Sequence, residues 1–168
     1  MKIKHLALAL TVSTCIVFFA CKKGNNNSTL HIRMTDAPVA LEEVNIDLVQ
    51  VNVKFAKDTT GWVSLETKPG IYNLLGLQNG VDTLIAQGSF PQDVVKEIRL
   101  VLGDRNSIKS DGQIYPLTIP SGSESGLKIK ISKQLRANLE TLLIDFDAAL
   151  SVKQEIDGFK LRPVLKLK

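Results

Sequence analysis

The stretch Asp111-Gly-Gln-Ile-Tyr-Pro-Leu-Thr-Ile-Pro-Ser-Gly-Ser-Glu-Ser-Gly-Leu-Lys-Ile-Lys-Ile-Ser132 indicates how this chain folds. Apolar residues alternate with polar ones on both sides of a loop rich in Pro, Ser and Gly, residues 120–126. Strands with one buried face and one wet face show this alternation. We therefore expect two strands joined by the loop as a hairpin. The core positions would be Tyr115, Leu117, Ile119, Leu127, Ile129 and Ile131.

The remaining chain is typical of further strands around the same core. Residues 44–55 are the longest candidate, and their apolar positions change phase near Leu48 and Val49, which predicts a bulge or bend there. Asp-Gly pairs at 111–112 and 157–158 are strong hairpin signals. These features predict an all-β fold, a single antiparallel β-sandwich.

Residues 135–150 fit two structures. Their leucines recur at helical spacing, while residues 140–146 also alternate as a strand would. Periodicity alone leaves both interpretations open.

The first twenty residues differ from the rest. A basic start at Lys2 and Lys4 precedes an apolar run, residues 6–20, that is short for a membrane span and typical of a secretory signal. Ala20-Cys21 at its end resembles a bacterial lipobox, although Phe18 stands where Leu is commonest. We therefore expect a signal peptide over 1–20, lipidation of Cys21, a polar linker over 21–28 and a folded domain over 29–168.

This N-terminus places the protein in the cell envelope. We expect a lipid anchor in the outer membrane of a Gram-negative bacterium, and the sequence leaves open whether the domain faces the periplasm or the surface. The linker residues 22–28 span at most about 25 Å, so the domain stays close to the membrane.

Charge and cysteine content exclude several classes of function. The net charge is +4, but with Lys2, Lys4, Lys22 and Lys23 set aside the remaining chain has 17 basic and 17 acidic residues, so no nucleic-acid partner is expected. The only cysteines are Cys15 and Cys21. The domain therefore has no disulfide, no thiol nucleophile and no cysteine ligands for structural zinc. His31 is its only histidine, so a catalytic triad has little support.

Several separate motifs resemble one bacterial lipoprotein family, called domain of unknown function 4382. They are Ile32–Pro38, Gly61–Val63, Pro69–Leu75, Ile98–Leu102, Gly112–Lys128 and Asp145–Ala148. The resemblance implies an all-β sandwich, transthyretin-like or Greek-key, with residues 140–146 as a strand. The family has no assigned activity, so the resemblance transfers no catalytic residues, and we predict none.

Carboxylates are the remaining candidates for a ligand or metal site. Asp145 and Asp147 lie two residues apart and would point the same way from a strand, and Asp36 lies in a turn that could meet them. Oxygen-rich sites of this kind bind calcium. We favour the simpler interpretation, with no cofactor: Asp36 and Asp147 cap turns and Asp145 is solvated.

Two surface features could bind a polysaccharide. The basic stripe Lys160, Arg162, Lys166 and Lys168 could grip an acidic chain, and Trp62 and Tyr72 could stack on a sugar. Each has a simpler interpretation, as the wet face of a strand and as core aromatics respectively.

The leading hypothesis is a membrane-anchored, non-enzymatic binding or structural domain for a carbohydrate or an envelope protein. The alternative is a hydrolase of envelope or extracellular glycans that works through Asp145 or Asp147.

Overall fold

Two packed β-sheets form the domain in the computed structural model, which describes residues 27–37, 41–58, 61–120, 126–136 and 138–168. The smaller sheet has the order β14 (Leu165–Leu167), β11 (Asn138–Phe146), β1 (Asn27–Thr35), β6 (Thr83–Pro91) and β4 (Glu66–Thr67). The larger sheet has the order β10 (Leu127–Gln134), β7 (Val94–Leu102), β2 (Glu43–Phe55), β8 (Ser107–Ser110), β9 (Gln113–Thr118), β13 (Gly158–Leu161) and β12 (Val152–Glu155). The short strands β3 (Val63–Ser64) and β5 (Gly70–Asn73) also pair with β2. The all-β sandwich predicted from the alternation is confirmed.

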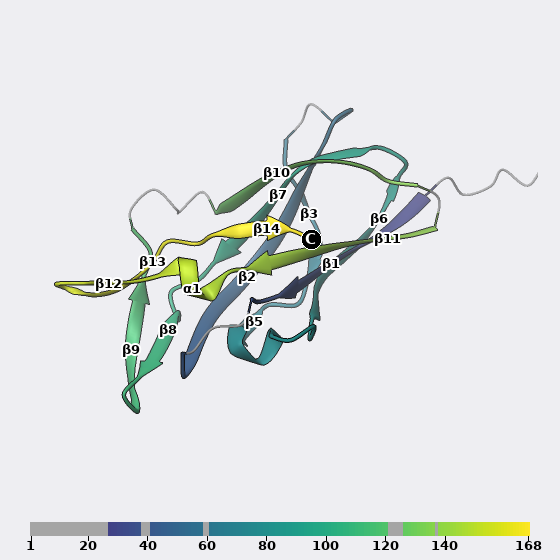
Figure 1. Ribbon diagram of the computed structural model, residues 1–168. Helices are drawn as coiled ribbons and strands as arrows, with labels where there is room; N and C mark the ends of the chain where they lie inside the picture. Colours follow the sequence, from purple (N-terminus) through teal and green to yellow (C-terminus); the bar gives the residue numbers. More distant parts are fainter. Residues whose placement is uncertain (1–26, 38–40, 59–60, 121–125, 137) are drawn as a thin grey trace, which may run out of the picture.

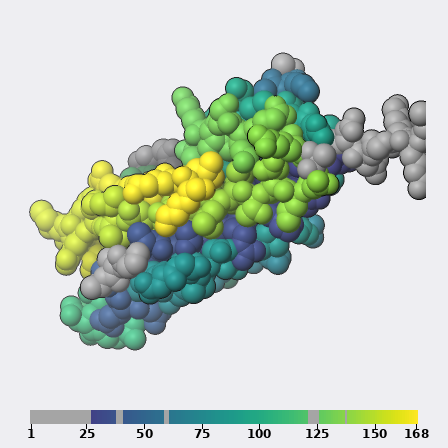
Figure 2. Space-filling model, turned by 45° about the vertical axis from the view of Figure 1, so that its right-hand side comes forward, coloured from purple at the N-terminus to yellow at the C-terminus, as the bar shows by residue number. Residues whose placement is uncertain are grey.

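The molecule is elongated, with its first strand starting at one end. In Figure 1, β1 begins at the end opposite to the hairpin of β12 and β13, and Figure 2 shows that hairpin projecting in yellow. The strand begins at Asn27, two residues earlier than the expected domain boundary. Cys21 and the signal segment lie outside the described residues, as does most of the 120–126 loop.

The core lies between the sheets, and β2 supplies much of it. Its buried residues are Val44, Ile46 and Leu48, then Val51, Val53 and Phe55 after a change of phase. The pairing of β2 with β7 shifts register between Leu48 and Gln50. The predicted bulge is confirmed, and it lets one long strand keep its apolar side chains on the core face along its whole length.

The hairpin expected around residues 120–126 is wrong. Strand β9 pairs with β8 and β13, and β10 pairs with β7. Alternation defines which face of a strand is buried but not which strand lies beside it, and the tight Asp111-Gly112 turn gives β9 its neighbour β8. Leu117 and Ile129 are buried as predicted, whereas Tyr115 is exposed and packs its ring against Phe159 at 5.3 Å.

The sheets are mixed, which corrects the expected antiparallel sandwich. Strand β1 pairs in parallel with β11 and antiparallel with β6, so it lies inside the smaller sheet. Strands β9 and β13 are also parallel. Parallel pairs join residues far apart in sequence, and no local turn signal reports them.

Residues 138–146 form the strand that the family resemblance implied, and helical spacing there was misleading. A single helical turn, α1 (Ala148–Ser151), and a 3-10 turn, η1 (Leu74–Leu77), are the helical elements of the described chain. Within the described ranges, no helix is long and apolar enough to cross a membrane.

Candidate functional site

Asp36, Asp145 and Asp147 meet at one end of the smaller sheet. Parallel pairing places Thr35 of β1 beside Asp145 of β11, so the next residue, Asp36, lies beside the turn into α1. All three aspartates are buried, at 2, 4 and 7% exposure respectively. The three aspartates therefore lie at one end of the sandwich, as the sequence suggested. The expectation that Asp145 is solvated is wrong, because its side chain is buried.

Asp36 joins three segments of the chain. One carboxylate oxygen accepts a hydrogen bond from the backbone N–H of Ala148 at 2.9 Å, and the other accepts from the Gln78 side chain at 3.0 Å. Burial raises the pKa of Asp36, and the nearby charge of Asp145 adds to this, although the hydrogen bonds to Ala148 and Gln78 oppose it. Asp36 therefore holds the end of β1 against α1.

Asp147 and Asp145 are each bound to a lysine from the last strand. Asp147 is the N-cap of α1, accepting from the N–H of Leu150 at 3.0 Å, and it lies 3.5 Å from the Lys166 ammonium. Asp145 pairs with the Lys168 ammonium at 3.1 Å, and its other oxygen is buried without a hydrogen-bond partner. Lys166 belongs to β14 and Lys168 follows it directly, and the sequence pattern did not place this strand beside β11.

The hydrogen bonds and ion pairs of the three aspartates therefore connect the ends of β1 and β11 to α1 and to the C-terminal residues. Within the described ranges, no group of three or more His, Cys, Asp or Glu side chains is placed to hold a metal ion. The cap interpretation agrees with the contacts of Asp147, whereas Asp36 binds two segments that are distant in sequence.

The basic stripe is divided between two sheets. Residues 160 and 162 lie at β13, while residues 166 and 168 lie at β14 on the smaller sheet. Each of these cations also has a carboxylate partner: Asp157 for Lys160, Glu155 for Arg162, Asp147 for Lys166 and Asp145 for Lys168. Cations that are already paired and point from different sheets do not form one anion-binding surface.

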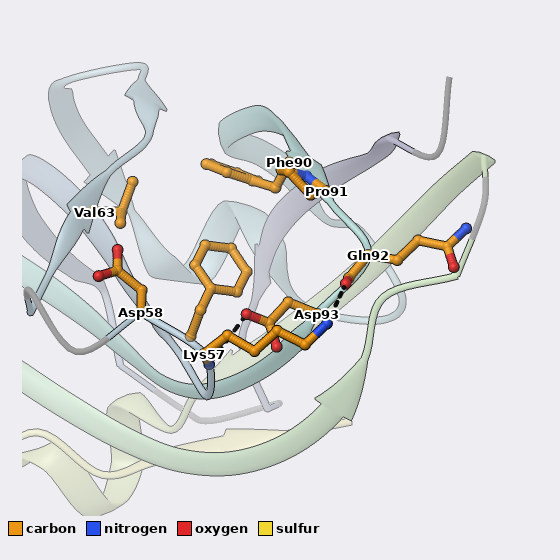
Figure 3. Close-up of a pocket in the computed structure, with 8 residues that line it drawn as sticks. Lys57, Asp58, Val63, Phe90, Pro91, Gln92 and Asp93 are labelled. Atoms are coloured by element: carbon orange, nitrogen blue, oxygen red, sulfur yellow. Dashed lines mark hydrogen bonds between the residues drawn. The ribbon is translucent and has the colours of Figure 1, made fainter. Parts of the chain in front are cut away.

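An apolar pocket of about 470 Å³ opens where β2 and β6 end (Figure 3). Its apolar walls are Phe55, Val63, Phe90 and Pro91, and the two phenylalanine rings lie 4.9 Å apart between centroids. Ligand-binding pockets of folded proteins have this size and this mostly apolar lining. The pocket lies beside the first residue of β1, because Asn27 pairs with Pro91.

Polar groups on the pocket rim are held in place. The Asp93 carboxylate accepts hydrogen bonds from the backbone N–H groups of Val94 at 2.7 Å and Lys57 at 3.2 Å. The Lys57 ammonium donates to the carbonyl of Gln92 at 3.3 Å (Figure 3). Polar groups held at the rim of a pocket with apolar walls can orient a ligand.

Sequence reasoning missed this pocket. Its walls come from three separate segments, so spacing along the chain does not reveal it. Phe90-Pro91 was the available signal, since proline ends a strand and leaves an aromatic residue at the sheet border.

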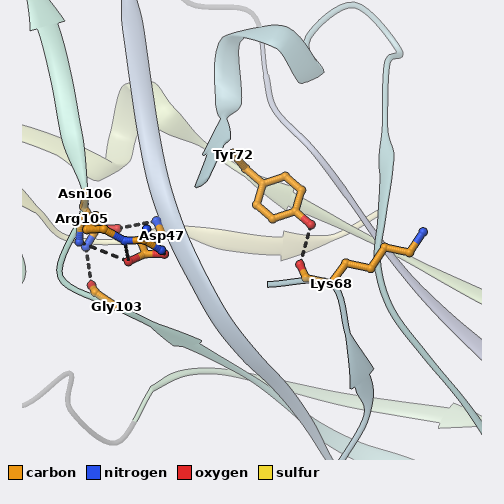
Figure 4. Close-up of polar contacts among 6 residues, drawn as sticks. All are labelled: Asp47, Lys68, Tyr72, Gly103, Arg105 and Asn106. Atoms are coloured by element: carbon orange, nitrogen blue, oxygen red, sulfur yellow. Dashed lines mark hydrogen bonds and ion pairs between the residues drawn. The ribbon is translucent and has the colours of Figure 1, made fainter. Parts of the chain in front are cut away.

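A second polar cluster ties β2 to the turn between β7 and β8 (Figure 4). The buried Asp47 carboxylate binds the Arg105 guanidinium through both oxygens at 2.8 Å. The Asn106 side chain accepts from the N–H of Asp47 and donates to the carbonyl of Gly103. Hydrogen bonding to Arg105 lowers the pKa of Asp47 and raises the pKa of Arg105. The cluster fixes the turn, and both carboxylate oxygens of Asp47 are bound to Arg105.

The two aromatic residues singled out in the sequence differ in their surroundings. The hydroxyl of Tyr72 donates to the carbonyl of Lys68 at 2.6 Å, and burial raises its pKa (Figure 4). Trp62 lies on the outer face of the larger sheet, where its ring stacks on Arg99. The core interpretation is therefore wrong for Trp62.

Comparison with protein families gives one match. The model of a family described as a domain of unknown function, DUF4382, matches residues 27–163. The chain belongs to this family. The match spans both sheets of the DUF4382 domain up to β13. No curated protein and no solved structure matches the chain.

Proposed function

We propose that this protein is a membrane-anchored lipoprotein of the cell envelope whose DUF4382 domain binds a ligand and catalyses no reaction. The observation that carries the proposal is the apolar pocket between Phe55 and Phe90, with its fixed polar rim. The preferred ligand is a carbohydrate with an apolar ring face, because aromatic walls pack against such faces while rim groups bind hydroxyls.

The proposed anchor is Cys21, attached through a short tether. A basic start, an apolar run and a small residue precede this cysteine in the order that lipidation requires. Five residues, 22–26, separate Cys21 from Asn27, where β1 begins, so the two are at most about 20 Å apart. The pocket lies at this end of the domain, so an anchored protein would present it towards the lipid surface.

The anchor is tested by growth with an alkyne-tagged palmitate and by fractionation of the cells. The wild-type chain and Cys15→Ala should incorporate the label and sediment with membranes, whereas Cys21→Ala should do neither. Cys15→Ala is the matched control because it removes the other cysteine of the chain. Membrane retention of an unlabelled wild-type chain would refute the anchor.

The pocket is tested by saturation-transfer NMR on residues 27–168 with a set of mono- and disaccharides. Phe90→Ala removes one wall and should abolish the transfer, whereas Ile71→Ala, which removes an exposed apolar side chain from β5, should preserve it. Equal transfer in both variants, or none from any sugar in the wild type, would refute a pocket for carbohydrate. A protein partner lost from Phe90→Ala alone would assign the same pocket to a protein side chain.

The contacts of Asp145 and Asp147 support the non-enzymatic proposal over the glycan hydrolase. A glycosidase needs two carboxyl groups facing each other across a groove, about 5–10 Å apart. Here each carboxylate is bound to a lysine, and Asp147 also caps α1. New reducing ends released from an envelope glycan by wild-type protein, and lost in Asp145→Asn, would reverse this preference.

A further inference from the structure

The outer face of the larger sheet carries an arginine stacked on the only tryptophan of the chain. Arg99 comes from β7, and its guanidinium carbon lies 4.0 Å from the centroid of the Trp62 ring. Its cross-strand neighbours are Asn52 on β2 and Lys128 on β10. Three strands and the segment before β3 therefore contribute to one surface.

Arg99 lacks the carboxylate partner that three other arginines of this domain have. Arg33, Arg105 and Arg162 each pair with a carboxylate. Among the described residues Arg99 has no carboxylate partner, and its Nε is buried without a hydrogen-bond acceptor. A guanidinium that has no carboxylate partner within the fold gains from a carboxylate or another anion that reaches its accessible part.

The position of Arg99 is fixed by close packing. Gly126 has φ +77°, and a Cβ there would lie 2.8 Å from Cγ of Arg99 and 2.9 Å from the carbonyl oxygen of Leu100. Only glycine fits so close to the arginine stem in this backbone conformation. With Trp62 on the guanidinium and Gly126 on the stem, the cation is held ready in one place.

The surrounding charge is mostly positive. Lys128 lies directly beside Arg99, and the next row across the strands holds Lys130, Glu97 and Lys54. Glu97 lies 3.9 Å from Lys54, so the face keeps an excess of cations around Trp62. Because the domain is close to neutral as a whole, this is a local feature of one face.

We propose that Trp62, Arg99 and Lys128 form a binding site for a glycan that carries carboxylate groups. The carboxylate takes the free donors of Arg99 with support from Lys128, and a sugar ring packs against the exposed part of Trp62. The proposal rests on the function of the domain as a binding module, but it uses a surface different from the Phe55–Phe90 pocket. It also assigns the anionic-glycan role to this face and not to the stripe at β13 and β14.

Because Trp62 is the single tryptophan, its fluorescence reports the site directly. The full chain, purified in a non-ionic detergent, is titrated with trigalacturonic acid, and with maltotriose as a neutral control. We expect a saturable fluorescence change with the acidic trisaccharide alone, which weakens as salt is added. An equal response to both sugars, or to neither, would overturn the proposal.

Variants separate the contributions of charge and ring. Calorimetric titration should show affinity for trigalacturonic acid falling about tenfold or more in Arg99→Gln and in Trp62→Ala, as expected for loss of a charged hydrogen bond or a stacked ring. Lys153→Ala removes an exposed lysine from β12 and should stay within about twofold. Circular dichroism confirms that each variant is folded. Loss in Arg99→Gln with none in Trp62→Ala would show simple charge attraction and refute a glycan site.

Phe90→Ala distinguishes this proposal from the function proposed for the pocket. It should leave the affinity for trigalacturonic acid unchanged. If Phe90→Ala abolishes binding while Arg99→Gln preserves it, the acidic sugar occupies the pocket, and the inference about the outer face is wrong although the binding function stands.

Discussion

Replacing Asp36 by alanine removes an acceptor that three segments of the domain share. The N–H of Ala148 is fully buried, so its loss of a partner costs about 1–3 kcal/mol. Gln78 loses a second hydrogen bond, which adds about 1 kcal/mol. We expect Asp36→Ala to lower the free energy of unfolding by about 2–4 kcal/mol.

Asp36→Asn keeps the shape and one acceptor while removing the charge. Its oxygen can still accept from Ala148, and Gln78 can turn its amide to face the new NH₂ group. Because burial raises the pKa of Asp36, the wild type gains stability from this group below about pH 4 and loses it as pH rises through the folded-state pKa. Asparagine does not ionise. The stability of Asp36→Asn relative to wild type should therefore increase between about pH 3.5 and pH 7.

The test is urea unfolding of residues 27–168, followed by circular dichroism at half-unit pH steps. A decrease in the relative stability of Asp36→Asn over that pH range would mean that the folded protein stabilises the ionised carboxylate. The conclusion that burial dominates at this site would then be wrong.

Three further predictions concern the larger sheet. In urea melts, Ile129→Ala should lower the free energy of unfolding by about 2–3 kcal/mol. Lys130→Ala, on the opposite face of the same strand, should change it by no more than about 0.5 kcal/mol, and the reverse order would contradict the assigned faces. Arg105→Gln removes the cause of the low pKa of Asp47. Its free energy of unfolding should therefore lie furthest below that of the wild type near pH 6, and the difference should shrink as pH falls below about 4. A difference that grows in acid would contradict the ion pair. Gly103→Ala would place a Cβ 2.5 Å from a carboxylate oxygen of Asp47 and should cost about 1–3 kcal/mol by thermal unfolding, and an unchanged melting temperature would show that the turn can relax.

The sequence predicted the faces of the strands better than their neighbours. The change of phase near Leu48 correctly indicated the bulge in β2, and both Asp-Gly pairs form the predicted hairpins, β8–β9 and β12–β13. These features depend on a few adjacent residues. The parallel partner of β1 lies about 110 residues away, and nothing in either segment identifies the other.

The candidate sites were predictable only in part. Turn chemistry indicated that Asp36 and Asp147 each cap a turn. Asp147 does so as the N-cap of α1, whereas Asp36 accepts from the N–H of Ala148, which lies 112 residues further along the chain. Asp145 is buried and paired with Lys168, the residue after β14, and its own sequence neighbourhood does not show this partner. Trp62 resembled a core aromatic in the sequence. It directly precedes β3, which pairs with one side of β2, whereas its partner Arg99 lies in β7 on the other side of β2, and no local pattern indicates this contact.

The place of β1 between β6 and β11 also determines how the domain would carry mechanical load. In the lipoprotein proposed above, a pull on the start of β1 along the strand axis would load the hydrogen bonds to both neighbouring strands in shear, so many would have to break at the same moment. A strand at the sheet edge, pulled sideways, would open one bond after another. A domain anchored as proposed would thus transmit the force through its central strand, and we expect β4 and β14, the two edge strands of the smaller sheet, to yield before β1 does.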